Sequence, residues 1–286
     1  MKRRLRRSRR LRFSLLMALS LVAGGSCHRR PAEKPVSAGK QSLSVYGPCF
    51  LSPPLRQLTR QFESQHPHLD VRLRVDKPGE MLRKVLEKGE RPSVFISQGE
   101  VELHRLEARG LVPQGQALRF AVSDLRLGLI VPRANPARVK RLADLASSRV
   151  KRIVLYDPET TTLGHRSRQA FQRQGIWERV QPKVFFAAPD QMFLTYLTEG
   201  QAEAAVVYQD CLFPDYEEGE EKEVPPTLKL VQTLPRSLYD PVYCYAAVLE
   251  GTESGDLARS FVAFLASAEA QPILAQHHLL QESPGP

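Results

Sequence analysis

The residues best suited to bind a ligand lie between Pro158 and Gly164, in the run P-E-T-T-T-L-G. The apolar run at 153–156 before Asp157 predicts a short buried strand, and a helix-compatible run follows Gly164. Backbone N–H groups at the start of a helix attract anions, and ligands of open α/β sheets sit at the carboxyl ends of strands. Three consecutive threonines add hydroxyl groups there. We interpret this loop as a candidate anion site; the alternative is an ordinary polar loop.

Cysteine thiols are the second set of groups that could do chemistry. Cys49, Cys211 and Cys244 are far apart in the sequence and show no C-x-x-C spacing. Three hypotheses are open: a disulfide between two of them, a buried thiol that packs as a small hydrophobe, and a soft-metal or thiophilic site through Cys49 and Cys211. A thiol enzyme would need a base such as His165 beside Cys49, and no pattern places one there. We expect a protein that is not an enzyme and that holds no metal ion or cofactor.

Alternating strand and helix patterns must position these residues. Strands are predicted at 42–46, 69–75, 94–96, 153–156, 184–186 and 204–208, with helical patterns between them. Ser52 is predicted to cap the first helix, whose first residue would then be Pro53. Strands that alternate with helices indicate βαβ units and mostly parallel sheets.

Two longer apolar runs, at 118–131 and 239–249, predict strands long enough to pass between two lobes. The expected fold is therefore α/β and two-lobed, each lobe a mostly parallel sheet flanked by helices, with two hinge strands between them. Lobe 1 would comprise residues 41–122 and 246–286, and lobe 2 residues 123–245. Such a hinged fold closes around a ligand.

The net charge of +10 is concentrated at the start of the chain. Residues 1–27 hold eight of the 41 basic side chains and no acidic one, which leaves 33 basic against 31 acidic residues elsewhere. A basic segment followed by the apolar run 13–23 is typical of a targeting signal. At about 1.5 Å per residue the apolar run is too short to span a bilayer core of about 30 Å. The charge therefore does not indicate nucleic-acid binding.

The small residues 24–26 precede Cys27, which resembles the cleavage site of bacterial lipoproteins. That resemblance implies a signal peptide at 1–27 and acylation of Cys27, with simple cleavage as the alternative. Residues 28–40 are rich in proline and polar residues and are predicted to be a flexible linker. We expect a protein of the periplasm or cell surface, anchored to the membrane by Cys27.

Several short motifs follow one another along the chain. They are V-Y-x-x-x-x-L-S-x-x-L-x-x-L-x-x-Q-F at 45–62, S-V-F-I-S at 93–97, L-G-L-I-V-P at 127–132, D-P-E at 157–159 with Gly164, and A-A-V-V-Y at 204–208. In this order and spacing they resemble the periplasmic molybdate-binding proteins of ABC importers, a family of type II periplasmic binding proteins. The resemblance extends from about residue 42 to about residue 280.

The resemblance implies a site in which neutral donors hold a tetrahedral oxyanion: two serine hydroxyls, backbone N–H groups and a tyrosine hydroxyl. The two serine positions fall on Phe50 and Gly79, the backbone-donor positions on Leu163 and Gln191, and the tyrosine on Tyr208. Each hydrogen bond lost from a charged ligand is worth about 1.5–3 kcal/mol, so the two missing serines weaken binding by more than about a hundredfold.

Other residues of the same loops are expected to contribute to the site. The candidates are the backbone at Cys49 and Ser52 in the first loop, the loop at 76–80, and the hydroxyl of Thr162 in the loop at 160–164. The function implied is capture of a molybdate- or tungstate-type oxyanion for an ABC permease of the cytoplasmic membrane, by a monomer with no nucleic-acid partner. The alternatives are a diverged cleft that binds a thiophilic metal ion through Cys49 and Cys211, and a thiol enzyme.

Overall fold

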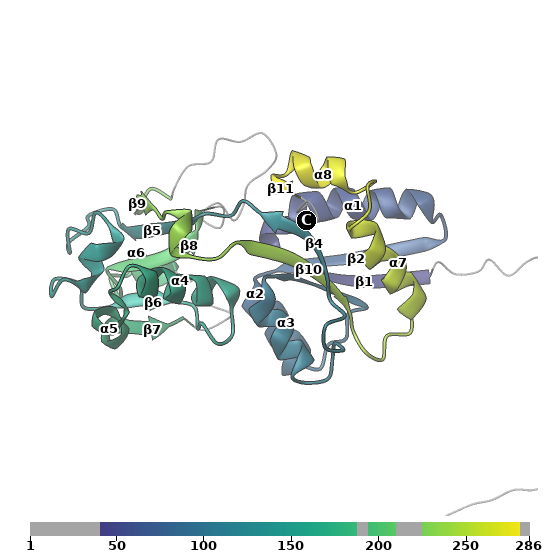
Figure 1. The fold of residues 1–286 in the computed structure, drawn as a ribbon, viewed down its shortest axis with the longest axis horizontal. Coiled ribbons are helices and arrows are strands. Elements are labelled where there is room, and N and C mark those ends of the chain that lie inside the picture. Colours follow the sequence, from purple (N-terminus) through teal and green to yellow (C-terminus); the bar gives the residue numbers. More distant parts are fainter. Residues whose placement is uncertain (1–40, 188–193, 210–224, 281–286) are drawn as a thin grey trace, which may run out of the picture. The chain divides into compact units, whose positions relative to one another are not determined.

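The protein is described by a computed structural model over residues 41–187, 194–209 and 225–280. Residues from 39 onward belong to one unit, which contains two separate sheets (Figure 1). We call each sheet, with the helices that cover it, a lobe. The two-lobed α/β architecture confirms the fold class expected from the sequence patterns.

Lobe 1 is built on a six-stranded sheet with the strand order β11-β4-β10-β3-β1-β2. The strands are β1 (Gln41–Pro48), β2 (Leu69–Asp76), β3 (Val94–Gln98), β4 (Leu118–Ser123), β10 (Val242–Val248) and β11 (Leu279–Leu280). Strand β1 pairs in parallel with β2 and β3, whereas β10, β4 and β11 are antiparallel to their neighbours. The sheet is therefore mixed, and β4 and β10 are the strands through which the chain leaves for lobe 2 and returns from it.

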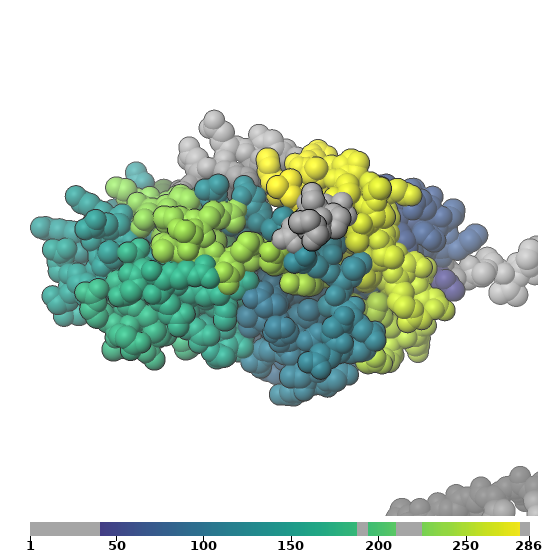
Figure 2. Space-filling model, in the orientation of Figure 1, coloured from purple at the N-terminus to yellow at the C-terminus, as the bar shows by residue number. Residues whose placement is uncertain are grey.

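The helices of lobe 1 bury one apolar face each against this sheet. They are α1 (Ser52–Gln65), α2 (Pro78–Leu86), α3 (Glu100–Glu107), α7 (Gly255–Leu265) and α8 (Gln271–Gln276). Leu55, Leu58 and Phe62 form the buried stripe of α1, at the spacing that the sequence predicts. Phe62 meets Phe261 of α7 edge to face, and Figure 2 shows the yellow atoms of α7 and α8 beside the blue atoms of α1.

Lobe 2 is built on a five-stranded sheet with the order β7-β6-β8-β5-β9. Its strands are β5 (Leu127–Pro132), β6 (Ile153–Leu155), β7 (Val184–Phe186), β8 (Ala204–Tyr208) and β9 (Leu228–Thr233). Its helices are α4 (Thr162–Arg173), α5 (Trp177–Val180) and α6 (Leu194–Thr198). Strand β6 is parallel to β7 and β8, and β5 is antiparallel to β8 and β9.

The two crossings between the lobes differ from the expected continuous strands. The run 118–131 is divided into β4 in the first sheet and β5 in the second, because residues 124–126 leave the ladder. In the second crossing, β10 pairs entirely within the first sheet. Tyr239 and Val242 pack in the core of lobe 2, while Cys244 and Ala246 pack in the core of lobe 1. The chain thus changes lobes at the start of β10.

Gly164 fixes the entry into α4, since a Cβ there would lie 2.3 Å from the Tyr156 carbonyl oxygen. We expect Gly164→Ala to lower the free energy of unfolding by about 1–3 kcal/mol, because backbone must move to admit the methyl group. Urea unfolding monitored by circular dichroism measures this difference.

The control is Gly255→Ala, in the first turn of α7, where the nearest atom to a Cβ is the flexible Arg259 guanidinium at 3.4 Å. It should leave the protein as stable as the wild type or slightly more stable. Equal effects of the two substitutions would contradict the close approach at Gly164.

Candidate functional site

The carboxyl ends of β1 and β2 bring two predicted ligand loops to one edge of lobe 1. Pro48 lies opposite Asp76 in the parallel ladder, so the turn Cys49–Leu51 after β1 lies beside the segment that leads into α2. Gly79 is half-buried in the first turn of α2. Cys49 and Gly79 were both predicted to line the site, and the register of β1 and β2 brings their loops together.

Phe50 lies between the hydrophobic cores of the two lobes. It is half-buried and packs against both clusters, and the cluster of lobe 2 also contains Leu163 and Tyr208. The structure therefore brings three of the predicted site residues into one cluster. At Phe50, however, the chain presents an aromatic ring where the resembling family presents a hydroxyl donor.

Ser52 does not cap α1, which corrects the sequence prediction. The helix begins at Ser52 itself, after the cap position Leu51, and no side-chain cap bond forms. The hydroxyl oxygen of Ser52 instead accepts a hydrogen bond of 3.2 Å from the Arg56 Nε. Ser52 lies one residue past the cap position, because the turn Cys49–Leu51 leads directly into α1.

The threonine-rich loop forms the start of α4. Thr161 is the N-cap, and its hydroxyl oxygen accepts from the Gly164 N–H at 3.1 Å. Thr160 and Thr161 both donate their hydroxyl hydrogens to the Asp157 carbonyl. Among the described residues, no hydrogen bond engages the N–H of Leu163. The resemblance implied this amide as a backbone donor, and amides in the first turn of a helix have no partner within the helix.

A buried carboxylate from lobe 1 accepts a hydrogen bond from the Thr162 N–H at the same helix end. Glu102 of α3 is 1% exposed, and its Oε1 accepts from the Thr162 N–H at 2.9 Å. Its Oε2 accepts from the Thr162 hydroxyl at 2.6 Å. Gly99, with φ of +108°, allows this approach, because a Cβ there would lie 2.3 Å from the Thr162 Oγ1.

The environment of Glu102 disfavours its charge. Burial raises the pKa of the Glu102 carboxyl from 4.5 to about 7, although both hydrogen bonds from Thr162 act to lower it. The negative charge of Glu100, two residues earlier, raises it further. A carboxyl group with this pKa exchanges its proton near neutral pH.

An ion pair lies beside this carboxylate. Arg166 of α4 has a side chain only 3% exposed, and its Nη2 lies 2.8 Å from the Glu100 Oε1 of α3. The same nitrogen donates to the Pro241 carbonyl at 3.1 Å, next to the second crossing. The two glutamates of the first turn of α3 thus both pair with α4, which joins the two lobes at this point.

Tyr208 ends β8 in the core of lobe 2 and is 2% exposed. It lies opposite Leu127 in the antiparallel pair of β5 and β8. Gln191, Cys211 and Cys27 lie outside the described residues. Their predicted roles as backbone donor, thiol ligand and lipid attachment site therefore remain predictions.

The two described cysteines, Cys49 and Cys244, are free thiols and form no disulfide with each other. Cys244 is buried in β10, and burial raises its pKa to about 12, which fits the hypothesis of a small packed hydrophobe. Cys49 is exposed, yet desolvation by its neighbours raises the pKa of its thiol. Neither environment favours the thiolate that nucleophiles and soft-metal sites require.

Among the described contacts, His165 forms no hydrogen bond with Cys49. It lies on α4, where its Nδ1 is 3.4 Å from the Arg168 guanidinium. Desolvation and the charges of Arg166 and Arg168 lower its pKa. No group of three or more His, Cys, Asp or Glu residues in the described ranges is placed to hold a metal ion.

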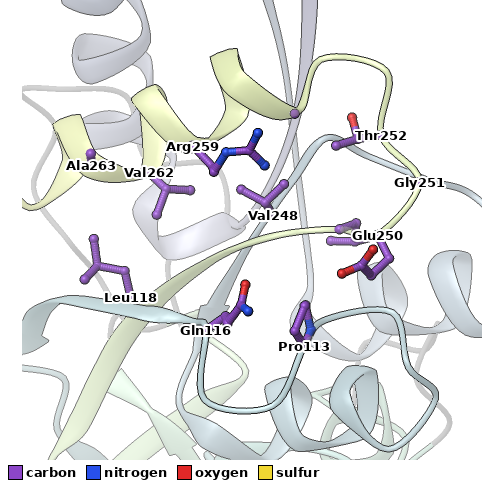
Figure 3. A pocket seen from close by; sticks show the side chains of 12 residues that line it. Pro113, Gln116, Leu118, Val248, Glu250, Gly251, Thr252, Arg259, Val262 and Ala263 are labelled. Carbon is purple, nitrogen blue, oxygen red and sulfur yellow. The ribbon is translucent and has the colours of Figure 1, made fainter.

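A surface pocket of about 440 Å³ lies elsewhere on lobe 1 (Figure 3). Figure 3 shows Arg259 and Val262 on α7 facing Val248 and Gln116 across it. None of the residues predicted to bind a ligand lines this pocket. Within the described chain, no helix is both long and apolar enough to span a membrane.

Two α/β lobes, with the chain crossing between them twice, are the architecture of periplasmic-type binding proteins. The family described as bacterial extracellular solute-binding protein matches residues 43–280, and the chain belongs to it. It is 22% identical to YvgL of Bacillus subtilis, named as an ABC transporter substrate-binding lipoprotein, over 94% of this chain and 97% of that protein. It is 26% identical to the molybdate-binding protein ModA of Mycobacterium tuberculosis, over 92% and 94%.

Solved structures share the fold at low identity. The periplasmic molybdate-binding protein of Azotobacter vinelandii superposes with a TM-score of 0.57 at 18% identity, over 84% of this chain and all of that one. The sulfate-binding protein SubI of Mycobacterium tuberculosis gives a TM-score of 0.59 at 14% identity, over 85% and 88%. The chain is thus a solute-binding protein of an ABC importer, as the motifs indicated, and is not an enzyme.

The raised pKa of Glu102 predicts a stability that depends on pH. The folded state holds the Glu102 proton more tightly than the unfolded state, so this contribution is full below pH 4.5 and is lost as the pH rises through about 7. Glu102→Gln keeps the shape of the side chain and both contacts with Thr162, although its amide N–H donates to the hydroxyl oxygen where the carboxylate accepted. We expect its free energy of unfolding to exceed that of the wild type by about 2–3 kcal/mol at about pH 8. The two should be equal near about pH 4.

Urea unfolding at both pH values measures the difference. Glu107→Gln removes a charge from the same helix without touching Thr162 and serves as the control. It should change the stability by less than about 0.5 kcal/mol at either pH. A Glu102→Gln effect that is the same at both pH values would show that Glu102 does not titrate in this range.

Proposed function

We propose that this protein captures a tetrahedral oxyanion of the molybdate or tungstate type and delivers it to an ABC permease. The observation that carries the proposal is the start of α4, where the Leu163 N–H has no partner among the described residues at the position the resemblance gives to a backbone donor. Helix N-termini with available N–H groups bind anions without a full counter-charge. The ModA relative is named for molybdate, which favours this ligand class.

The proposed site has fewer side-chain hydrogen-bond donors than the resemblance to molybdate-binding proteins implies. Phe50 and Gly79 occupy the two serine positions, and Phe50 fills space between the two cores. The proposed binding set consists of Leu163, Thr162, Tyr208 and the backbone around Cys49 and Ser52. It also includes Gln191, which lies outside the described residues. We therefore propose that affinity for molybdate is modest and that the protein acts as a monomer.

Calorimetry tests the ligand class directly. We expect the mature protein to bind molybdate or tungstate and the variant with Phe50→Ser and Gly79→Ser to bind about a hundredfold more tightly, because two hydrogen bonds to a charged ligand are restored. Phe50→Ala with Gly79→Ala removes the same ring without adding donors and is the matched control. If neither the wild type nor the serine variant binds molybdate, tungstate or sulfate, the proposed ligand class is wrong.

We further propose that Cys27 is acylated and holds the protein at the outer face of the cytoplasmic membrane. The cationic and apolar segment before Cys27 and the lipoprotein name of the YvgL relative support this proposal. The linker 28–40 would then separate the binding domain from the membrane.

Fractionation of cells that express the full chain tests the anchor. Wild-type protein is expected in the membrane fraction, because acyl chains hold proteins at membranes. Its mass should exceed that of the cleaved polypeptide by the mass of the attached lipid. Cys27→Ser is expected in the soluble fraction, and Cys49→Ser, which keeps Cys27, is the control. Wild-type protein recovered as unmodified polypeptide would contradict acylation.

A further inference from the structure

The hydroxyl of Thr162 is committed to Glu102 in the described structure. Its oxygen lies 2.6 Å from the Glu102 Oε2, and an ionised carboxylate can only accept, so the threonine hydrogen points at the carboxylate. The Thr162 N–H is likewise directed to the Glu102 Oε1. While Glu102 is ionised, Thr162 therefore has no donor to offer an anion.

An anion bound to the Leu163 N–H lies close to the Glu102 carboxylate. Successive residues of a helix rise by only about 1.5 Å, so an oxyanion on the Leu163 N–H lies beside the group that holds Thr162. Two negative charges in a buried site repel strongly, and one of them is neutralised when a proton is available. Glu102 is the acid positioned to take that proton.

We propose that this protein takes up one proton on Glu102 for each oxyanion it captures, and that the Thr162 hydroxyl turns from Glu102 to the anion as it does so. The proton comes from water or buffer and converts the carboxylate into a carboxylic acid. The new O–H donates to the Thr162 oxygen across the existing short contact, and the carbonyl oxygen continues to accept from the Thr162 N–H. The threonine hydrogen is released toward the anion. This inference rests on the proposed function.

No described ion pair neutralises the Glu102 carboxylate, so it loses its charge by taking up a proton. On α3 itself Glu100 adds repulsion, while His104, Arg105 and Glu107 follow later in the helix. Helix α4 contributes His165, Arg166 and Arg168, of which Arg166 pairs with Glu100 and Arg168 with Glu159. Strand β3 contributes no ionisable side chain, and β10 contributes Tyr243, Tyr245 and the buried thiol of Cys244, whose pKa is raised to about 12 by burial.

Helix α2 also packs against α3, through a mainly apolar face. Its charged residues are engaged with one another and with the end of β2: Arg83 pairs with Glu80, and Lys84 with Asp76. The buried hydrogen-bond partner of the Glu102 carboxylate is thus a neutral residue, Thr162.

Release of the Thr162 hydroxyl from Glu102 supplies a hydrogen-bond donor in place of the one that the first loop lacks. With Phe50 and Gly79 at the serine positions, a released Thr162 hydroxyl restores one side-chain donor beside the Leu163 amide. Thr162 was singled out among the candidate site residues from the sequence. Its partner Glu102 determines when that hydroxyl is available.

Calorimetry with molybdate and with sulfate between about pH 6 and about pH 9 tests this coupling, since both anions stay fully ionised over that range. We expect the wild-type Kd to rise about tenfold per pH unit above about pH 7, where a proton must be taken up. Titrations in two buffers of different ionisation enthalpy at about pH 8 should give one proton bound per anion.

Four variants assign the effect to the two residues. Glu102→Gln carries a permanent amide donor toward the Thr162 oxygen, so it should bind at every pH with the affinity of the wild type at about pH 6, and without proton uptake. Glu107→Gln is the matched control and should keep the wild-type pH dependence. Thr162→Val should bind weakly throughout, whereas Thr162→Ser, which keeps the hydroxyl group, should regain the dependence of Kd on pH and the proton uptake.

The outcomes separate the inference from the proposed function. A wild-type Kd that does not change with pH, with no proton uptake, overturns the inference and leaves anion capture intact. Binding by Glu102→Gln alone at about pH 8 supports the inference, because removal of the charge suffices. Absence of binding by both the wild type and Glu102→Gln over the whole pH range overturns the proposed function, and the inference with it.

Discussion

The contact on which the arrangement of this site depends is the pair of hydrogen bonds from Thr162 to Glu102. A carboxylate that is 1% exposed has lost nearly all of its hydration, and two hydrogen bonds to a charged group, each worth about 1.5–3 kcal/mol, offset only part of that cost. Burial dominates, because the pKa is raised to about 7. The start of α4 is thus held by a group that is close to losing its charge under ordinary conditions.

Two glycines make this contact sterically possible. Gly99 follows β3 as the N-cap of α3, with a positive φ, and lies against the Thr162 side chain. Gly164 lets the first turn of α4 pack on the carbonyls of Tyr156 and Asp157. A methyl group would overlap the Thr162 side chain at Gly99 and the backbone before α4 at Gly164. The Arg166–Glu100 ion pair then fixes the orientation of α3 relative to α4 through one further turn. Tight backbone approach and paired charges therefore act on the same short stretch of both helices.

Much of the fold could be predicted from the sequence, because local periodicity marks the elements. The face of α1, the strand β6 and the helix after the threonines all follow from apolar spacing, and the loop before α4 was identified from its composition. Strand β9 was missed because it follows an acidic stretch and its pairing with β5 is non-local. Glu102 gave no signal, since an acid in the first turn of a helix is common at exposed positions and only the contact with α4 buries it.

The divergence at Phe50 and the presence of Glu102 have a common physical consequence. An aromatic ring at a donor position gains packing against two cores but contributes no dipole to an anion. A site that has lost donors needs another source of hydrogen bonds, and the hydroxyl already present at the helix start is Thr162, which Glu102 engages. Family membership accounts for the two-lobed scaffold. On the proposed coupling, the protonation state of Glu102 sets whether the Thr162 hydroxyl can donate to an anion. The affinity of such a site then depends on the pH as well as on the donors that the loops present.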